Sequence, residues 1–102
     1  IIIYGEKPKK NTMNEKIFIT AIHECLTNTV SHANGKTMFV YIESINNHLV
    51  ITINNDGDKP KNEIVERGGL SGLRTLVEKA CGKMTIYSKP EFNLIINLPL
   101  GE

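Results

Sequence analysis

The sequence has only two cysteines, almost no net charge and no long apolar run, and these shortages argue against several classes of protein. A net charge of +1, with acids and bases interspersed, gives no electrostatic basis for binding nucleic acid or an anionic membrane surface. No apolar run approaches the roughly 18 residues of a membrane-spanning helix. Residues 1–5 are too short for a signal peptide and lack its basic flank.

What remains is an ordinary globular composition, with 40% hydrophobic residues in 102. We predict one domain over residues 1–102 with a single modest core. Cys25 and Cys81 fall on the apolar sides of segments with helical spacing, which favours buried free thiols over a disulfide or a metal site. Free thiols are typical of a reducing cytoplasm. Because the first residue is Ile1 and not Met, we expect a fragment of a longer protein.

Two segments have apolar residues at helical spacing, over residues 14–33 and 70–80. Their predicted buried positions are Phe18, Ile22, Cys25, Leu26, Val30 and Ala33 in the first, and Leu70, Leu73, Val77 and Ala80 in the second. Glycine follows each helix, at Gly35 and Gly82, as is usual after a helix C-terminus.

Five segments are predicted to be strands: residues 1–4, 37–44, 48–54, 83–88 and 92–98. The central pair alternates clearly, with Met38, Val40, Ile42, Leu49, Ile51 and Ile53 on one face. The short link Asn46-Asn47 predicts a hairpin between them. The order strand, helix, hairpin, polar loop, helix, hairpin predicts an α+β, two-layer sandwich, with helices on one face of a mixed, largely antiparallel sheet.

The first segment that can carry chemistry lies on the first predicted helix. Glu24, Asn28 and His32 are four residues apart, so they form one stripe beside the apolar face. The amide oxygen of Asn28 is a ligand that Mg²⁺ accepts together with waters and phosphates. Glu24 could orient a water molecule or support the metal. The alternative is a solvated polar face of a helix.

The second segment is Ile53-Asn54-Asn55-Asp56-Gly57-Asp58, where a strand ends in a polar loop over residues 55–69. A polar side chain there can bind the edge of a base, and Gly57 would let the backbone approach a flat ring. The same residues are also typical of a plain turn. So long a loop in so small a domain is often a functional lid.

The third segment is glycine-rich and leads into the second predicted helix. Its residues are Gly68, Gly69, Leu70, Ser71, Gly72, Leu73 and Arg74. Free N–H groups and the positive end of the helix dipole suit a phosphate there. Arg74 could contact a phosphate oxygen or pair with Glu78 one turn later. An ordinary helix start is the alternative.

Together the three segments resemble the N, G1 and G2 boxes of the GHKL (Bergerat-fold) ATPases, the superfamily of histidine kinases and gyrase. Residues 24–33 resemble the N box of bacterial sensor histidine kinases. Residues 69–74, followed by Val77-Glu78 and then Gly82, resemble the G2 box of their short-lid subgroup, and Leu98-Pro99 matches the usual end of the domain. The resemblance implies a catalytic domain that binds ATP and Mg²⁺.

That resemblance implies a role for each matching residue. Glu24 would be the catalytic residue, and Asn28 would bind both the nucleotide and Mg²⁺. The remaining ATP-binding positions would be His32, Asn55, Gly57, Gly69, Leu70, Gly72, Leu73 and Arg74. His32 would lie near the ribose or phosphates, Gly57 beside adenine, and Gly69 and Gly72 at the phosphates.

Three positions depart from the family pattern. Asn55 stands where the family usually has the aspartate that binds adenine, Ser31 where many members have a cation, and Lys59 where the G1 box has its second glycine. An amide loses the charge-assisted part of the adenine hydrogen bond. We therefore expect weakened ATP affinity but not its loss.

By this resemblance the chain is the kinase domain of a two-component sensor, donating the γ-phosphoryl group of ATP to a histidine on a separate dimerisation domain. A response regulator would act downstream. The isolated fragment is expected to be a cytoplasmic monomer that does not phosphorylate itself, with a parent protein either free or membrane-anchored. The alternatives are an anti-sigma factor serine kinase of the same fold and a degenerate nucleotide-binding module that acts by protein contact.

Overall fold

The computed structural model describes residues 1–31, 37–55, 69–87 and 92–100, and only the backbone of residues 28–31. Two helices and five strands form within these ranges. They are, in chain order, β1 (Ile2–Tyr4), α1 (Met13–Ser31), β2 (Met38–Ile45), β3 (His48–Asn55), α2 (Gly69–Lys79), β4 (Lys83–Tyr87) and β5 (Asn93–Pro99). The predicted order of elements is confirmed, with boundaries that shift by one or two residues where both ends are described.

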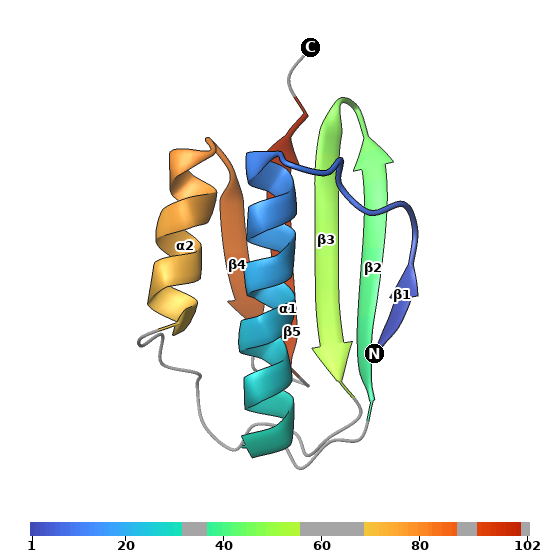
Figure 1. Ribbon diagram of the computed structural model, residues 1–102, viewed down its shortest axis with the longest axis vertical. Helices are drawn as coiled ribbons and strands as arrows, with labels where there is room; N and C mark the ends of the chain where they lie inside the picture. Colours follow the sequence, from blue (N-terminus) through green and yellow to red (C-terminus); the bar gives the residue numbers. More distant parts are fainter. Residues whose placement is uncertain (32–36, 56–68, 88–91, 101–102) are drawn as a thin grey trace.

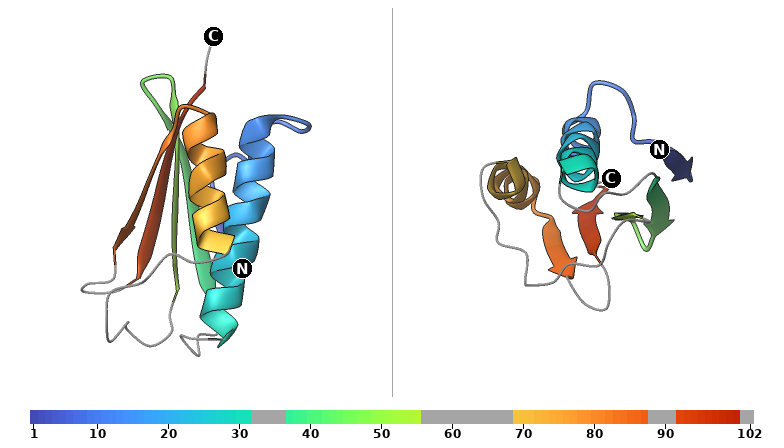
Figure 2. Two further views of the ribbon diagram at one scale, coloured as in Figure 1. Left: turned by 90° about the vertical axis from the view of Figure 1, so that its left-hand side faces the viewer. Right: turned by 90° about the horizontal axis from the view of Figure 1, so that it is seen from below.

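The five strands form one sheet in the order β1-β2-β3-β5-β4. β1 pairs with β2 in parallel, and all other pairs are antiparallel. Both helices lie on the same face of this sheet, α1 over its centre and α2 toward β4 (Figures 1 and 2). The predicted two-layer α+β sandwich with a mixed sheet is therefore confirmed.

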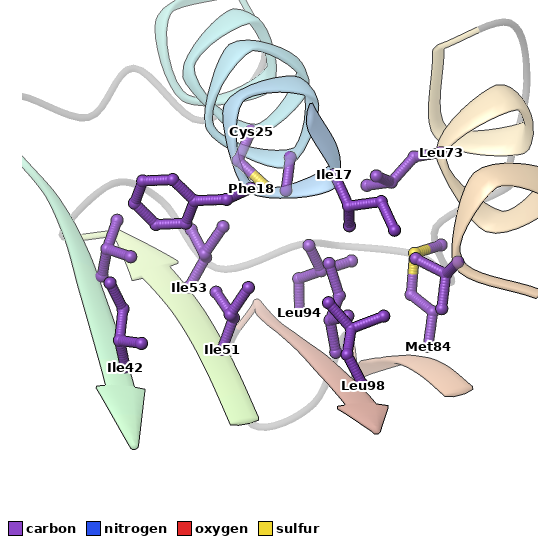
Figure 3. Close-up of a cluster of buried hydrophobic side chains, with 14 of the residues drawn as sticks. Ile17, Phe18, Cys25, Ile42, Ile51, Ile53, Leu73, Met84, Leu94 and Leu98 are labelled. Carbon is purple, nitrogen blue, oxygen red and sulfur yellow. The ribbon is translucent and has the colours of Figure 1, made fainter. Parts of the chain in front are cut away.

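The core lies between the helices and the inward side of the sheet (Figure 3). Each strand supplies alternate residues to it, as a pleated strand must when only one face is covered. The predicted inward residues of β2 and β3 are all buried: Met38, Val40, Ile42, Leu49, Ile51 and Ile53. From β5 come Leu94, Ile96 and Leu98, which have no exposed surface.

The buried face of α1 is turned around the helix axis relative to the face that its sequence predicts, and Ile22 is only partly buried. Phe18 and Cys25 are buried as expected, but Leu26 is 37% exposed, so its prediction was wrong. Ile17 and Ala21, which the predicted set left out, have no exposed surface. Leu26 lies about 100° around the helix from Cys25, which turns it past the edge of the contact with the sheet. Val30 and Ala33 lie outside the described side chains.

The outward face of the sheet carries no helix in the described part of the chain (Figure 2). Tyr4 of β1 and Tyr41 of β2 are paired in register on that face. Their rings stack, with centroids 5.1 Å apart and planes 9° apart. This contact supplements the short parallel pairing that holds β1 at the sheet edge.

The β2–β3 hairpin turns at Asn46 and Asn47, as predicted. Both residues have positive φ, 49° and 63°. Two consecutive positive φ angles are the signature of the tight hairpin turn that matches strand twist, and asparagine tolerates this conformation better than most residues.

The end of α2 corrects the prediction for Cys81. The helix ends at Lys79, and Cys81 is an exposed residue of the following turn with φ 61°. The N–H of Gly82 donates to the carbonyl of Val77, and that of Cys81 to the carbonyl of Glu78, which is the Schellman arrangement. A Cβ on Gly82 would lie 2.7 Å from the carbonyl oxygen of Asn97. Glycine is therefore needed at 82 for space, and Cys81 takes the left-handed conformation.

Candidate functional site

The described parts of the three segments that the sequence marks for chemistry lie toward the same end of the molecule. α1 ends there, β3 ends there, and α2 begins there, at the lower end of Figure 1. This follows from topology, because α1 and β3 run in the same direction while α2 runs back against them. Elements far apart in sequence thus bring their ends to the same side of the molecule.

One contact between these segments joins Glu24 and Gly69. A Cβ placed on Gly69 would collide with the carboxylate of Glu24, and all three of its nearest atoms belong to that group. Glu24 is half-buried on α1, and Gly69 is the first residue of α2. The structure therefore brings the predicted catalytic acid to the beginning of the phosphate-compatible helix.

Gly72 has a different environment. It is exposed, and a Cβ there would meet no described atom within 4 Å. Its φ is not positive either, so neither packing nor backbone geometry in the described part of the chain demands a glycine at this position. Open space beside the first turn of a helix is compatible with an approaching phosphate.

Leu70 and Leu73 turn away from this open side. Leu70 is 6% exposed and Leu73 is fully buried, the latter in the main core (Figure 3). Their side chains hold α2 on the sheet. Their assignment to the nucleotide site remains a prediction. Because both side chains are buried, a contact with the nucleotide would have to come from their main-chain atoms.

Arg74 has a partner that the sequence did not indicate. Its Nη1 donates a hydrogen bond of 2.8 Å to the main-chain carbonyl oxygen of Met84 on β4. The half-buried guanidinium therefore links the middle of α2 to the edge strand. A phosphate contact for Arg74 remains a prediction.

Asn55 is the last residue of β3 and is half-buried. It pairs in register with Met38, whose buried side chain points to the helices. Alternation along β3 places Asn55 on the same side as Ile53, which is the side that the helices cover. Its neighbour Asn54 faces the other side and donates a hydrogen bond of 3.4 Å to Asn93. Asn55 is thus on the face where a nucleotide between helix and sheet would need it.

Other predicted residues fall outside the description. The side chains of Asn28 and Ser31 are not described, and His32, Gly57 and Lys59 lie outside the described residues. Their roles, including the Mg²⁺ ligand, stay predictions. In the described ranges, no three His, Cys, Asp or Glu side chains gather to hold a metal.

The pKa of Cys25 is affected by burial and by the charge of its neighbour Glu24. Burial raises the pKa of its thiol to about 12, and the negative charge of Glu24 adds to this rise. The prediction of a buried free thiol is confirmed for Cys25. Sequence spacing identified Glu24 and Gly69 separately, but gave no signal that they touch.

Curated relatives of this chain are two sensor histidine kinases of Bacillus subtilis. The chain is 32% identical to DesK over 89 residues, which is 85% of this chain and 24% of DesK. It is 32% identical to YxjM over 79 residues, covering 78% of this chain and 19% of YxjM. The chain is a homologue of the sensor histidine kinases. It spans a quarter or less of the length of these relatives, and no family model matches it.

Solved structures show that the fold is that of histidine kinase domains. The blue-light activated histidine kinase of Erythrobacter litoralis EL346 superposes with a TM-score of 0.76 at 17% identity, covering 96% of this chain and 36% of that one. The histidine kinase AdeS of Acinetobacter baumannii gives a TM-score of 0.64 at 12% identity, covering 98% of this chain and 55% of that one. Within the residues described for the present chain, neither helix has the length and apolarity to cross a bilayer.

Proposed function

We propose that this chain binds Mg-ATP at the end where α1, β3 and α2 meet, and donates the γ-phosphoryl group to a histidine on a separate dimerisation domain. The single observation that carries the proposal beyond homology is the contact of Glu24 with Gly69. It joins the N-box and G2-box motifs in space, as a shared nucleotide site requires.

The described residues fit a triphosphate. α2 is an 11-residue helix with no acidic residue of its own in the first turn, so its free N–H groups and dipole favour an anion. Gly72 leaves space on the open side of that turn. Asn55 lies on the sheet face that an adenine between helix and sheet would contact.

In this proposal, Asn28 would hold Mg²⁺, which supplies charge neutralisation for the phosphates when bound. Glu24 supports the geometry of metal and phosphate, since the acceptor is a side chain on another domain. Gly69 and Gly72 line the phosphates, Gly57 and Asn55 contact adenine, and His32 lies near the ribose. Phosphoryl transfer then depends on positioning and on electrostatic stabilisation by these groups.

Titration calorimetry of the chain with ATP tests the binding step, with and without Mg²⁺. We expect magnesium-dependent binding that is weakened by Asn28→Ala. Saturation at 100 times the dissociation constant should add about 2.7 kcal/mol of stability. No magnesium-dependent affinity for adenine nucleotides would instead favour a degenerate module, which Asn55, Ser31 and Lys59 already suggest.

Incubation with γ-labelled ATP tests the transfer step. The chain has three histidines, His23, His32 and His48, and in this proposal all of them belong to the part that binds ATP. We expect no label on the chain alone, and an acid-labile label on an added dimerisation domain that carries an acceptor histidine. A label on this chain, or an acid-stable label on a serine of the added protein, would contradict the proposal.

A further inference from the structure

The outer face of the sheet, which no helix covers in the described part of the chain, carries very little charge (Figure 2). Among the strand positions that alternate with the core, only Glu43 of β2 and Lys83 of β4 are acidic or basic. All three tyrosines of the chain lie on this face: Tyr4, Tyr41 and Tyr87. Tyrosine is enriched, and charge is depleted, where proteins bind other proteins.

The two charges have symmetric positions on this face. Glu43 pairs in register with Val50 of β3, which pairs with Asn97 of β5. Asn97 in turn pairs with Lys83, so these residues form one row across four strands with the charges at its two ends. Three strand spacings separate the charges by roughly 14 Å, which is too far for an ion pair within one chain. A line between β3 and β5, parallel to the strands, is equally distant from both charges.

A second copy of the chain can pair both charges at once. A two-fold rotation about that line packs the outer faces of two sheets together, with β2 of each copy opposite β4 of the other. Glu43 of each copy then lies opposite Lys83 of the other copy, so the contact contains two ion pairs. Phe39 and Tyr87 also end a common row, so the same rotation places these two aromatic residues opposite each other.

The area of the face is sufficient for a weak dimer. The strands β2, β3, β5 and β4 have 8, 8, 7 and 5 residues. At about 3.3 Å per residue and about 4.8 Å between strands, they cover a flat area of roughly 450 Å² per copy. Because side chains make the accessible area larger than the flat area, two copies would bury about 1,000 Å², the lower limit for a specific interface.

We propose that this chain forms a two-fold dimer through the outer faces of its sheets, with Glu43 of each copy paired to Lys83 of the other. The dimer goes beyond the proposed function and does not depend on it. Both helices lie on the opposite face of the sheet, so they stay outside the contact (Figure 2). Such a dimer differs from the monomer that the sequence led us to expect.

Sedimentation equilibrium of the purified chain, without nucleotide, tests the proposal. Between about 10 µM and about 1 mM we expect the average mass to rise from that of one chain toward that of two. Lys83→Glu places a glutamate opposite Glu43 at both ends of the row, and should weaken the dimer at least about tenfold. Glu43→Lys should have the same effect. Glu78→Lys is the matched control, because it reverses an exposed charge on α2, on the other side of the sheet.

Combining the two reversals separates an intermolecular contact from an effect on folding. The double variant Glu43→Lys, Lys83→Glu restores opposite charges at both ends, so its dissociation constant should return to within about threefold of the wild type. An equimolar mixture of the two single variants should form a heterodimer, at least about tenfold tighter than either variant alone. In that mixture one chain carries lysine at both positions and the other carries glutamate at both.

Thr52→Arg provides a test that does not involve the two charges. Thr52 pairs in register with Ile95, so it lies beside the line between β3 and β5, at the centre of the proposed contact. An arginine there would be buried without a partner, and only monomer should remain. A chain that stays monomeric at about 1 mM would overturn the proposal. So would a dimer that survives Thr52→Arg, or one that the charge reversals leave unchanged.

Discussion

Arg74 of α2 donates a hydrogen bond from Nη1 to the main-chain carbonyl oxygen of Met84, 2.8 Å away on β4. β4 lies at the edge of the sheet and has only β5 as a strand neighbour in the described sheet. The bond therefore ties the helix to a strand that pairs on one side only. The charged side chain of Arg74, which belongs to the glycine-rich motif, therefore helps to hold the fold together.

Arg74→Ala should lower the free energy of unfolding by about 1.5–3 kcal/mol, the usual loss for a hydrogen bond with a charged partner. Urea denaturation measures it. Lys79→Ala, an exposed change at the end of the same helix, is the control and should shift stability by only a few tenths of a kcal/mol. If Arg74→Ala leaves the urea midpoint unchanged but abolishes ATP affinity, the main role of Arg74 is to bind the phosphates and not to stabilise the fold.

Cys81→Gly should stabilise the protein. A residue other than glycine costs about 1–2 kcal/mol in the left-handed conformation, and the greater freedom of glycine in the unfolded chain offsets part of the gain. We expect a net gain of about 0.5–1 kcal/mol, measured as a rise in melting temperature. Gly82→Ala should do the opposite, because its Cβ would press on Asn97 and Leu98 of β5. Changes of the same sign in both variants would contradict this account of the turn.

Local periodicity predicted the elements, because strands and helices bury one face each and their spacing shows in the sequence. It misplaced Cys81, since the spacing of Leu73, Val77 and Ala80 continues toward it. The left-handed conformation falls on Cys81, because the close approach of β5 requires the glycine at the next position, Gly82. No pattern within residues 70–82 contains that information.

For the candidate site, too, the sequence predicted which residues matter but not the tertiary contacts that they make. The motifs identified Glu24, Asn55 and Gly69 by residue type and order. That Glu24 touches Gly69 depends on how α1 packs against α2, and the Arg74 bond depends on the position of β4. Sequence spacing within one helix offered only Glu78 as a protein partner for Arg74.

The two cysteines should differ sharply in reactivity. Cys81 is exposed, whereas Cys25 is buried with the pKa of its thiol raised to about 12. Because the thiolate is the reactive form, a disulfide reagent at pH 8 should modify one thiol per folded chain and the second only after unfolding. Cys81→Ser should abolish the fast reaction, and Cys25→Ala should leave it intact. Two rapidly reacting thiols in the wild type would be incompatible with a buried Cys25.

Cys25 also makes stability depend on alkaline pH. Its pKa is higher in the folded state than the ordinary value of 9.0, so the folded chain keeps a proton that the unfolded chain releases. The stabilisation is complete below pH 9 and is lost as pH rises toward about 12, on the order of 1 kcal/mol between pH 9 and pH 10. In Cys25→Ala the fall over this range should be shallower, as urea midpoints at several pH values would show. Parallel profiles for the two proteins would contradict the assignment.

Asn55→Asp should strengthen ATP binding, because a carboxylate on the helix-facing side of β3 accepts the hydrogen bond of the adenine amino group with charge assistance. A gain of roughly 1 kcal/mol corresponds to about fivefold in the dissociation constant. Asn54→Asp introduces the same charge one residue earlier, on the opposite side of the strand, and should give no gain. GTP separates specific contact from general electrostatics, since guanine presents a carbonyl oxygen where adenine presents its amino group. Calorimetry should therefore show tighter ATP binding and no improvement for GTP in Asn55→Asp. Equal changes for both nucleotides, or a gain in Asn54→Asp, would mean that Asn55 does not contact the base.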